Sequence, residues 1–139
     1  MYPEELVAPM REDLVVAGFT ELKTAADVEN HLGNHSGTSL IVINSVCGCA
    51  AGSARPGVKM ALQKTEKHPN NLMTVFAGVD KDAVNKVRQY TAPYPPSSPS
   101  IALFKDGELV HFIERHHIEG RNAEMISAHL AEVFEEFCN

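Results

Sequence analysis

The chain has no tryptophan, only three cysteines among its 139 residues, and no long apolar run. No stretch approaches the roughly 20 apolar residues that cross a bilayer. Its N-terminus, MYPEELVAPMRED, has acidic residues where a secretory signal needs a basic patch followed by an apolar run. We therefore expect a cytoplasmic location, and in that reducing compartment a structural disulfide is not expected.

Basic residues are also scarce. Eighteen acidic residues against 12 basic ones give a net charge of −6, and the lysines and arginines form no cluster. This balance argues against nucleic acid or an anionic membrane as a partner. A hydrophobic content of 44% and this length predict one domain, spanning residues 1–139, with a core of its own.

Two extended segments and a hairpin are expected. Residues 38–44, TSLIVIN, form a nearly unbroken apolar and β-branched run, which is typical of a strand buried on both faces. Residues 72–80 form the second strand. Residues 101–113 form a hairpin around Asp106-Gly107, the strongest turn signal in the chain.

Helical spacing or capping signals mark five further segments, at residues 9–17, 24–33, 53–67, 81–90 and 122–137. Pro9 is expected at a first helical position, and Thr24 at a helix N-cap. Pro56 leaves two alternatives open: either a helix begins at Cys49 and is kinked by Pro56, or Ser53 caps a later helix start. The last helix should bury one apolar side, formed by Met125, Ile126, Leu130, Val133, Phe134 and Phe137.

The order of these elements predicts an α/β fold. A βαβ unit followed by a ββα unit makes a mixed sheet with helices on both faces, preceded here by additional N-terminal helices. That is the arrangement of thioredoxin. Two cysteines where the first core strand meets its helix, and a proline that opens the hairpin, fall where this fold requires them.

The sequence NSVCGCAAG places Cys47 at the strand exit and Cys49 one glycine further along. Helix N-terminal N–H groups stabilise a thiolate, so Cys47 is the expected nucleophile and the more acidic, more exposed thiol. Cys49 would resolve a mixed disulfide formed by Cys47, and Gly48 would permit the tight backbone between them. A disulfide across one intervening residue is strained, which predicts an oxidising couple.

Two other interpretations of the cysteine pair stay open. The thiols could be ordinary buried side chains, since cysteine often behaves as a small hydrophobe. Alternatively, the pair could form part of a metal-binding or metal-delivery module, with further ligands from His111, His116 and His117. The incomplete ligand set makes the metal interpretation the weaker of the two functional hypotheses.

Pro99 and Cys138 complete the set of notable residues. A cis Ser98–Pro99 bond would present the backbone at Ser98 to an incoming peptide, although trans is the commoner state of such bonds in general. Cys138, next to the C-terminal residue, is expected to be an exposed or half-packed thiol and inert, because nothing basic adjoins it in the sequence.

The segments NSVCGCAAGSARPG, VFAGVDKDA and PPSSPSIALFKDGELVHFIERHHIEGR, with the C-terminal cysteine, resemble the bacilliredoxins over nearly the whole chain. The resemblance implies a thioredoxin-like fold and a thiol–disulfide oxidoreductase that removes bacillithiol from S-bacillithiolated cytoplasmic proteins, with weak disulfide-isomerase activity in some members. By position, Cys47 would receive bacillithiol, Cys49 would be the second motif cysteine, and Pro99 the cis proline. Gly48, Ser98 and Pro99 are expected to bind the substrate. Bacillithiol would be the thiol co-substrate, with no tightly bound cofactor and no metal.

The sequence departs from ordinary thioredoxin in two ways. Val46 stands where thioredoxin has an aromatic residue before the motif, and residues 39–46 contain no aspartate or glutamate. The buried carboxylate that helps thioredoxin deprotonate its second cysteine is therefore missing. Without a nearby base, attack by Cys49 should be slow, so release of the adduct from Cys47 by another bacillithiol becomes plausible.

Overall fold

Strand β2 (Thr38–Asn44) lies in the middle of the sheet, and all seven of its residues are buried. The computed structural model describes residues 2–33 and 36–139. Leu40 and Val42 belong to one hydrophobic cluster, and Ile41 and Ile43 to a second cluster on the other face. Because side chains alternate between the two faces of a strand, the unbroken apolar run is explained by burial on both sides, as expected.

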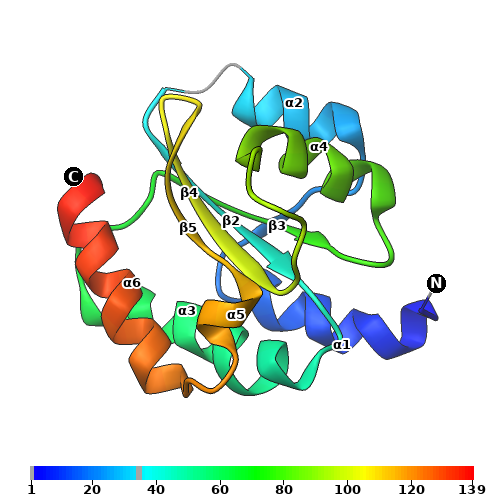
Figure 1. Cartoon of the computed structure of the whole chain (residues 1–139), viewed down its shortest axis with the longest axis horizontal. Coiled ribbons are helices and arrows are strands. Elements are labelled where there is room, and N and C mark those ends of the chain that lie inside the picture. The colour runs from blue at the N-terminus through cyan, green and yellow to red at the C-terminus, as the bar shows by residue number, and fades with distance from the viewer. Residues whose placement is uncertain (1, 34–35) are drawn as a thin grey trace.

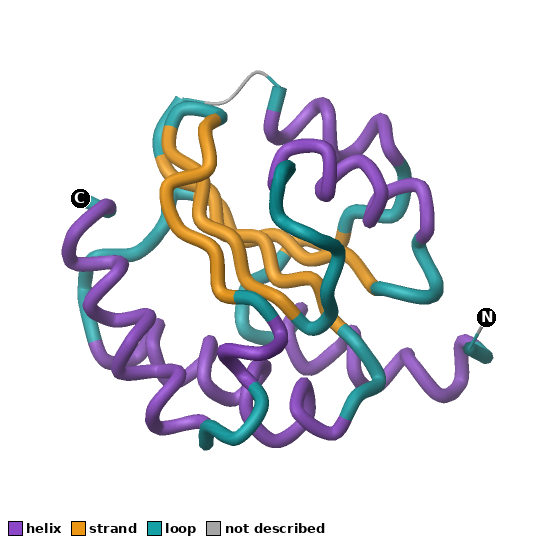
Figure 2. The backbone as a smooth tube through the Cα atoms, viewed as in Figure 1, coloured by secondary structure: helices purple, strands orange, loops and turns teal. Residues whose placement is uncertain are grey.

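The sheet has five strands in the order β1-β3-β2-β4-β5 (Figures 1 and 2). In chain order, the other four strands are β1 (Thr20–Glu21), β3 (Asn71–Phe76), β4 (Ser100–Lys105) and β5 (Glu108–Ile113). β3 runs parallel to β1 and β2, whereas β4 is antiparallel to both β2 and β5. The mixed sheet and the hairpin are confirmed, and β1 is a short strand that the sequence did not reveal.

Helices cover both faces of the sheet (Figure 1). One layer holds α2 (Ala25–Leu32) and α4 (Lys81–Thr91), and the other holds α1 (Glu4–Val15), α3 (Arg55–Lys64) and α6 (Ala123–Phe137). A capping box formed by Thr24 and Asp27 begins α2, as expected. The four-residue helix α5 (Arg115–Ile118), between β5 and α6, was not predicted. Among the described residues, no helix is long and apolar enough to cross a membrane.

The helix after the cysteines was predicted over residues 53–67, but in the structure it both begins and ends earlier. Helical backbone begins at Gly48, adopts π geometry over η1 (Ala50–Ala54) and continues as α3. The N–H of Arg55 donates to the carbonyl of Ala50, five residues back, directly before Pro56. A π turn accommodates Pro56 because this residue has no N–H and its ring would press on the carbonyl four residues earlier in a regular helix. The first of the two alternatives therefore holds, with a π segment in place of a simple kink.

Pro9 lies inside α1, so its expected first position was wrong. The helix begins at Glu4, where acidic side chains in the first turn interact favourably with the positive end of the helix dipole. Its buried face is formed by Val7, Arg11 and Leu14, spaced four and three residues apart. Pro9 lies on the exposed side of the helix, where the missing hydrogen bond costs least.

Three other details differ from the sequence expectations. β3 ends at Phe76 rather than at residue 80, because the chain turns at Gly78 with a φ of +84°. Met125 is 54% exposed, since α6 turns Ile126 rather than Met125 towards the core. Cys138 is 4% exposed and packs in the cluster between the sheet and α6, so it is neither exposed nor half-packed.

The contact between α3 and α6 gives a prediction about stability. A Cβ at Gly57 would lie 2.7 Å from the Cβ and Cγ2 of Ile126, whereas a Cβ at Gly52 would meet nothing within 4 Å. We expect Gly57→Ala to lower the free energy of unfolding by about 1–3 kcal/mol. Gly52→Ala, the matched control in the same helical segment, should leave it unchanged or slightly raised. Urea unfolding measures both; equal effects of the two substitutions would contradict this account of the helix contact.

Candidate functional site

Strand register brings three separate segments together beyond the end of β2. Ile43 of β2 pairs with Ser100 of antiparallel β4, and Ile101 pairs with Ile113 of β5. Residues that follow Ile43 therefore lie beside residues that precede Ser100, and beside those that follow Ile113. This register places the cysteine motif, the Ser98–Pro99 segment and the start of α5 at one edge of the sheet.

A buried polar network holds the chain between β2 and the motif. Asn44 accepts hydrogen bonds at Oδ1 from the backbone N–H of Ser45 (2.8 Å) and from Nη1 of Arg55 (2.8 Å). The same Nη1 donates to the carbonyl of Ser45 (3.0 Å), while Asp13 lies 3.4 Å from Nε of Arg55. Ser45 in turn accepts the N–H of Cys47 at Oγ (3.0 Å). Because these groups are buried and paired, they fix where Cys47 leaves the strand.

Cys47 Sγ accepts hydrogen bonds from several donors. The two motif sulfurs are 2.8 Å apart as free thiols, and the backbone N–H of Cys49 lies 3.4 Å from Cys47 Sγ. The hydrogen bonds from the thiol and the N–H of Cys49 lower the pKa of Cys47 most, with smaller contributions from Arg115 and the N–H of Ala50. Burial, followed by the neighbouring Cys47, raises the pKa of Cys49. The expected order of acidity is therefore reproduced.

Arg115 is the functional residue that sequence reasoning missed. Its Nη2 donates to Cys47 Sγ (3.3 Å), and its Nη1 donates to the carbonyl of Ser98 (3.2 Å). Nε of the same guanidinium is paired with Glu119 one turn along the chain. A single planar cation thus joins the nucleophile to the segment opposite it. The hairpin register contained the signal, because Arg115 follows Ile113 by only two residues.

The Ser98–Pro99 bond is cis, as predicted, and Pro99 is buried while Ser98 is half-buried. The carbonyl of Ser98 accepts a hydrogen bond from Arg115, and the N–H of Ser98 donates to no described residue. At Ser98, the N–H is therefore the backbone group that remains available to an incoming carbonyl. Ser98 shares a groove of about 400 Å³ with Cys47, lined by Tyr2, Ser45, Val46, Cys47, Ala77, Gly78, Ser98 and Arg115.

The structure corrects the steric argument for Gly48. Its φ is not positive, and a Cβ there would meet nothing within 4 Å, so the backbone between the cysteines does not require glycine. What Gly48 provides is an exposed position without a side chain, located between the two cysteines in the chain. Its part in substrate binding stays a prediction. Cys49 packs against the core beside α3, consistent with a second, less accessible thiol.

The structure does not bring the histidines proposed as further metal ligands to the cysteines. His111 contacts His129 of α6, and His117 lines the same histidine pocket as that pair. In the described ranges, the one group of three ligand-type residues within reach of one another is Glu114, His116 and His117, and it contains neither motif cysteine. A metal site on the cysteine pair therefore lacks its expected partners.

Known proteins share both the sequence and the fold. A sequence profile of the disulphide isomerase family matches residues 2–138. A bacilliredoxin from Cytophaga hutchinsonii is 66% identical over 98% of this chain and 99% of its own length. A Bacillus cereus bacilliredoxin is 53% identical over 99% and 95% of the two chains. The chain belongs to the bacilliredoxin family.

Solved structures agree on the fold of this bacilliredoxin. The thioredoxin-like domain of Arabidopsis NCP is 16% identical, with a TM-score of 0.61 over 87% of this chain and 79% of that one. Fasciola hepatica thioredoxin, also 16% identical, gives a TM-score of 0.55 over 86% and 99%. The thioredoxin-like fold and the bacilliredoxin relatives together make the protein a thiol oxidoreductase.

The contact between Arg115 and Cys47 gives a prediction for this oxidoreductase. In protein carrying Cys49→Ser and Cys138→Ser, Arg115→Gln should raise the pKa of Cys47, because the thiolate loses a cationic donor. The alkylation rate at pH 7 should fall several-fold, and its pH profile should move to higher pH. Arg121→Gln, which removes an arginine that makes no contact with Cys47, is the control. Identical profiles for the Arg115→Gln and parent proteins would show that the guanidinium does not act on the thiolate.

Proposed function

We propose that the protein removes bacillithiol from S-bacillithiolated cytoplasmic client proteins, with Cys47 as the nucleophile. The observation that carries the proposal is the environment of Cys47 Sγ, which faces a groove and accepts hydrogen bonds from Cys49 and from Arg115. These contacts favour the thiolate, the reactive form in thiol–disulfide exchange. Near full-length similarity to proteins named bacilliredoxin supports bacillithiol as the thiol concerned.

The first step exchanges one disulfide for another. The Cys47 thiolate attacks the bacillithiol sulfur of the client's mixed disulfide, a bond forms between these two sulfurs, and the client sulfur leaves as a thiolate that takes up a proton. No net oxidation occurs in this step, because one sulfur–sulfur bond replaces another. Arg115 holds the attacking thiolate beside the Ser98–Pro99 segment.

Two routes can then regenerate Cys47. In the first, Cys49 attacks Cys47, which releases bacillithiol and leaves a Cys47–Cys49 disulfide; an external dithiol reductant must later reduce that bond. In the second, a free bacillithiol attacks the adduct and leaves as bacillithiol disulfide, with Cys47 restored. The raised pKa of Cys49 and the absence of a carboxylate in residues 39–46 make Cys49 a slow attacker, which favours the second route.

The groove also supports recognition of a protein client. The free N–H of Ser98 can donate to the client's backbone, as in peptide recognition by an added strand. Val46, Ala77 and Gly78 leave the rest of the groove with small or apolar walls. Rearrangement of disulfides in such a client would use the same two cysteines, and we propose it as a weaker, secondary isomerase activity.

The two-route scheme predicts an asymmetric effect of cysteine substitution. Cys47→Ser should reduce bacillithiol release from a model client to the uncatalysed rate, because no nucleophile remains in the groove. Cys49→Ser should retain part of the activity, provided that free bacillithiol is present. Mass spectrometry of protein and client follows the adduct, and Cys138→Ser serves as the matched control. Full activity of Cys47→Ser, or adducts found only on Cys49, would refute the assignment.

The short motif also predicts the redox poise. A disulfide across one intervening residue is strained, so the Cys47–Cys49 couple should be more oxidising than thioredoxin at about −270 mV. A difference of 30 mV corresponds to about 1.4 kcal/mol and is measurable in thiol/disulfide buffers. Insulin reduction should be slow relative to bacillithiol removal. A potential at or below that of thioredoxin, with fast insulin reduction and no bacillithiol removal, would instead indicate a general reductase.

A further inference from the structure

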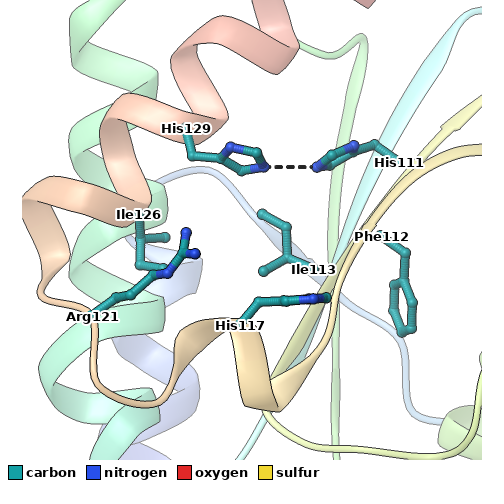
Figure 3. A pocket seen from close by; sticks show the side chains of 7 residues that line it. All are labelled: His111, Phe112, Ile113, His117, Arg121, Ile126 and His129. Atoms are coloured by element: carbon teal, nitrogen blue, oxygen red, sulfur yellow. Dashed lines mark hydrogen bonds between the residues drawn. The ribbon is translucent and has the colours of Figure 1, made fainter.

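Two histidines outside the reaction groove face each other between β5 and α6. Nε2 of His111 and Nε2 of His129 are 2.9 Å apart, and the rings point these atoms at one another (Figure 3). Neither ring has any other hydrogen bond among the described residues. A neutral pair shares one proton through this contact, with one ring as donor and the other as acceptor. No carbonyl or carboxylate of the described residues therefore bonds to either ring, and the two imidazoles bond only to each other.

From this pair we infer a binding site for a divalent transition-metal ion such as Zn²⁺, held by His111 and His129 and completed by Glu132 and Glu136. Metal–nitrogen bonds of about 2.0–2.1 Å place adjacent imidazole nitrogens roughly 2.9–3.4 Å apart, depending on coordination geometry. The observed separation lies at the lower end of that range. For a cation to replace the shared proton, both rings must turn so that their Nε2 lone pairs converge on one point beside the present contact.

Carboxylates lie on one side of the histidine pair. A hollow there, of about 210 Å³, is lined by His111, His129, Glu132, Val133 and Glu136. On α6, Glu132 and Glu136 follow His129 by three and seven residues, so all three lie on one helix face. Both glutamates are exposed and have no ion-pair partner in the described part of the chain, unlike neighbouring Glu135, which is paired with Lys67. Their carboxylates do not lie within ligand reach of both histidines in the described structure, so both side chains must turn towards the ion.

The protonation of the pair suits ligation. Burial, followed by the neighbouring His129, lowers the pKa of His111, while the charge of Glu136 opposes that shift. Burial therefore favours the neutral form of His111, which is the form that binds a metal ion. On the other side of the pair, Arg121 and His117 line the histidine pocket (Figure 3). The positive charge of Arg121 disfavours a cation on that side, so we place the ion on the side of Glu132 and Glu136.

A competing cluster, Glu114, His116 and His117, has its groups committed to local structure. The backbone N–H of Glu114 donates to Nδ1 of His117 (3.2 Å), and the Glu114 side chain accepts from the N–H of His117 in a capping box. His116 pairs with the same carboxylate. These contacts begin helix α5, and an ion there would have to break them.

The test uses tag-free protein carrying Cys47→Ser and Cys49→Ser, so that the motif thiols cannot bind metal and the outcome is independent of thiol exchange. Calorimetric titration with Zn²⁺ should give one ion per chain, with affinity that falls as the pH is lowered and His111 is protonated. On this background, His111→Gln or His129→Gln should weaken binding more than roughly tenfold, and Glu136→Gln should weaken it less.

His116→Gln, which removes a ligand of the competing cluster, is the matched control and should leave Zn²⁺ binding unchanged. Circular dichroism and thermal unfolding verify that each variant folds, and Zn²⁺ should raise the melting temperature of the parent but not of His129→Gln. Imidazole NMR signals of His111 and His129 should shift on Zn²⁺ addition. Absence of binding by the folded parent, or binding lost in His116→Gln but kept in His129→Gln, would overturn the proposal.

Discussion

The antiparallel pairing of β2 with β4 is the constraint on which the reactive site depends. With Ile43 opposite Ser100, the chain that leaves β2 must pass the chain that enters β4, and the following turn of the hairpin brings α5 to the same edge. A shift of this register by one residue would turn Leu40 and Val42 to the wrong core. The alignment of Cys47, Ser98 and Arg115 therefore depends on this register.

Much of the fold could be predicted because local signals agreed with burial. Residues 38–44 carry apolar side chains on both faces, and Asp106-Gly107 marks the turn of the hairpin through positive φ at both residues. The cysteine pair and the cis Ser98–Pro99 bond were also located, because their places follow from the order of the elements. The reactive roles of these residues still rest on the experiments above.

Other features were not predictable because they depend on contacts between distant segments. Arg11 of α1, on the side opposite Pro9, forms a bidentate pair with Asp80 of a loop 69 residues away, and no local pattern reveals this contact. Cys138 is buried because α6 ends against the sheet, although chain ends usually fray. Arg115 carries no local motif, since only the register of the hairpin relates it to Cys47.

The ion pair between Arg115 and Cys47 has a consequence for the cycle of the site. While Cys47 is a thiolate, its negative charge balances the guanidinium 3.3 Å away. Once Cys47 sulfur enters a disulfide, it becomes neutral, and the groove gains one unit of net positive charge without any movement of the backbone. An approaching thiolate therefore meets less repulsion at the adduct-bearing protein than at the thiolate form, while Glu119 stays paired with the guanidinium. The local electrostatic field thus follows the oxidation state of a single sulfur atom.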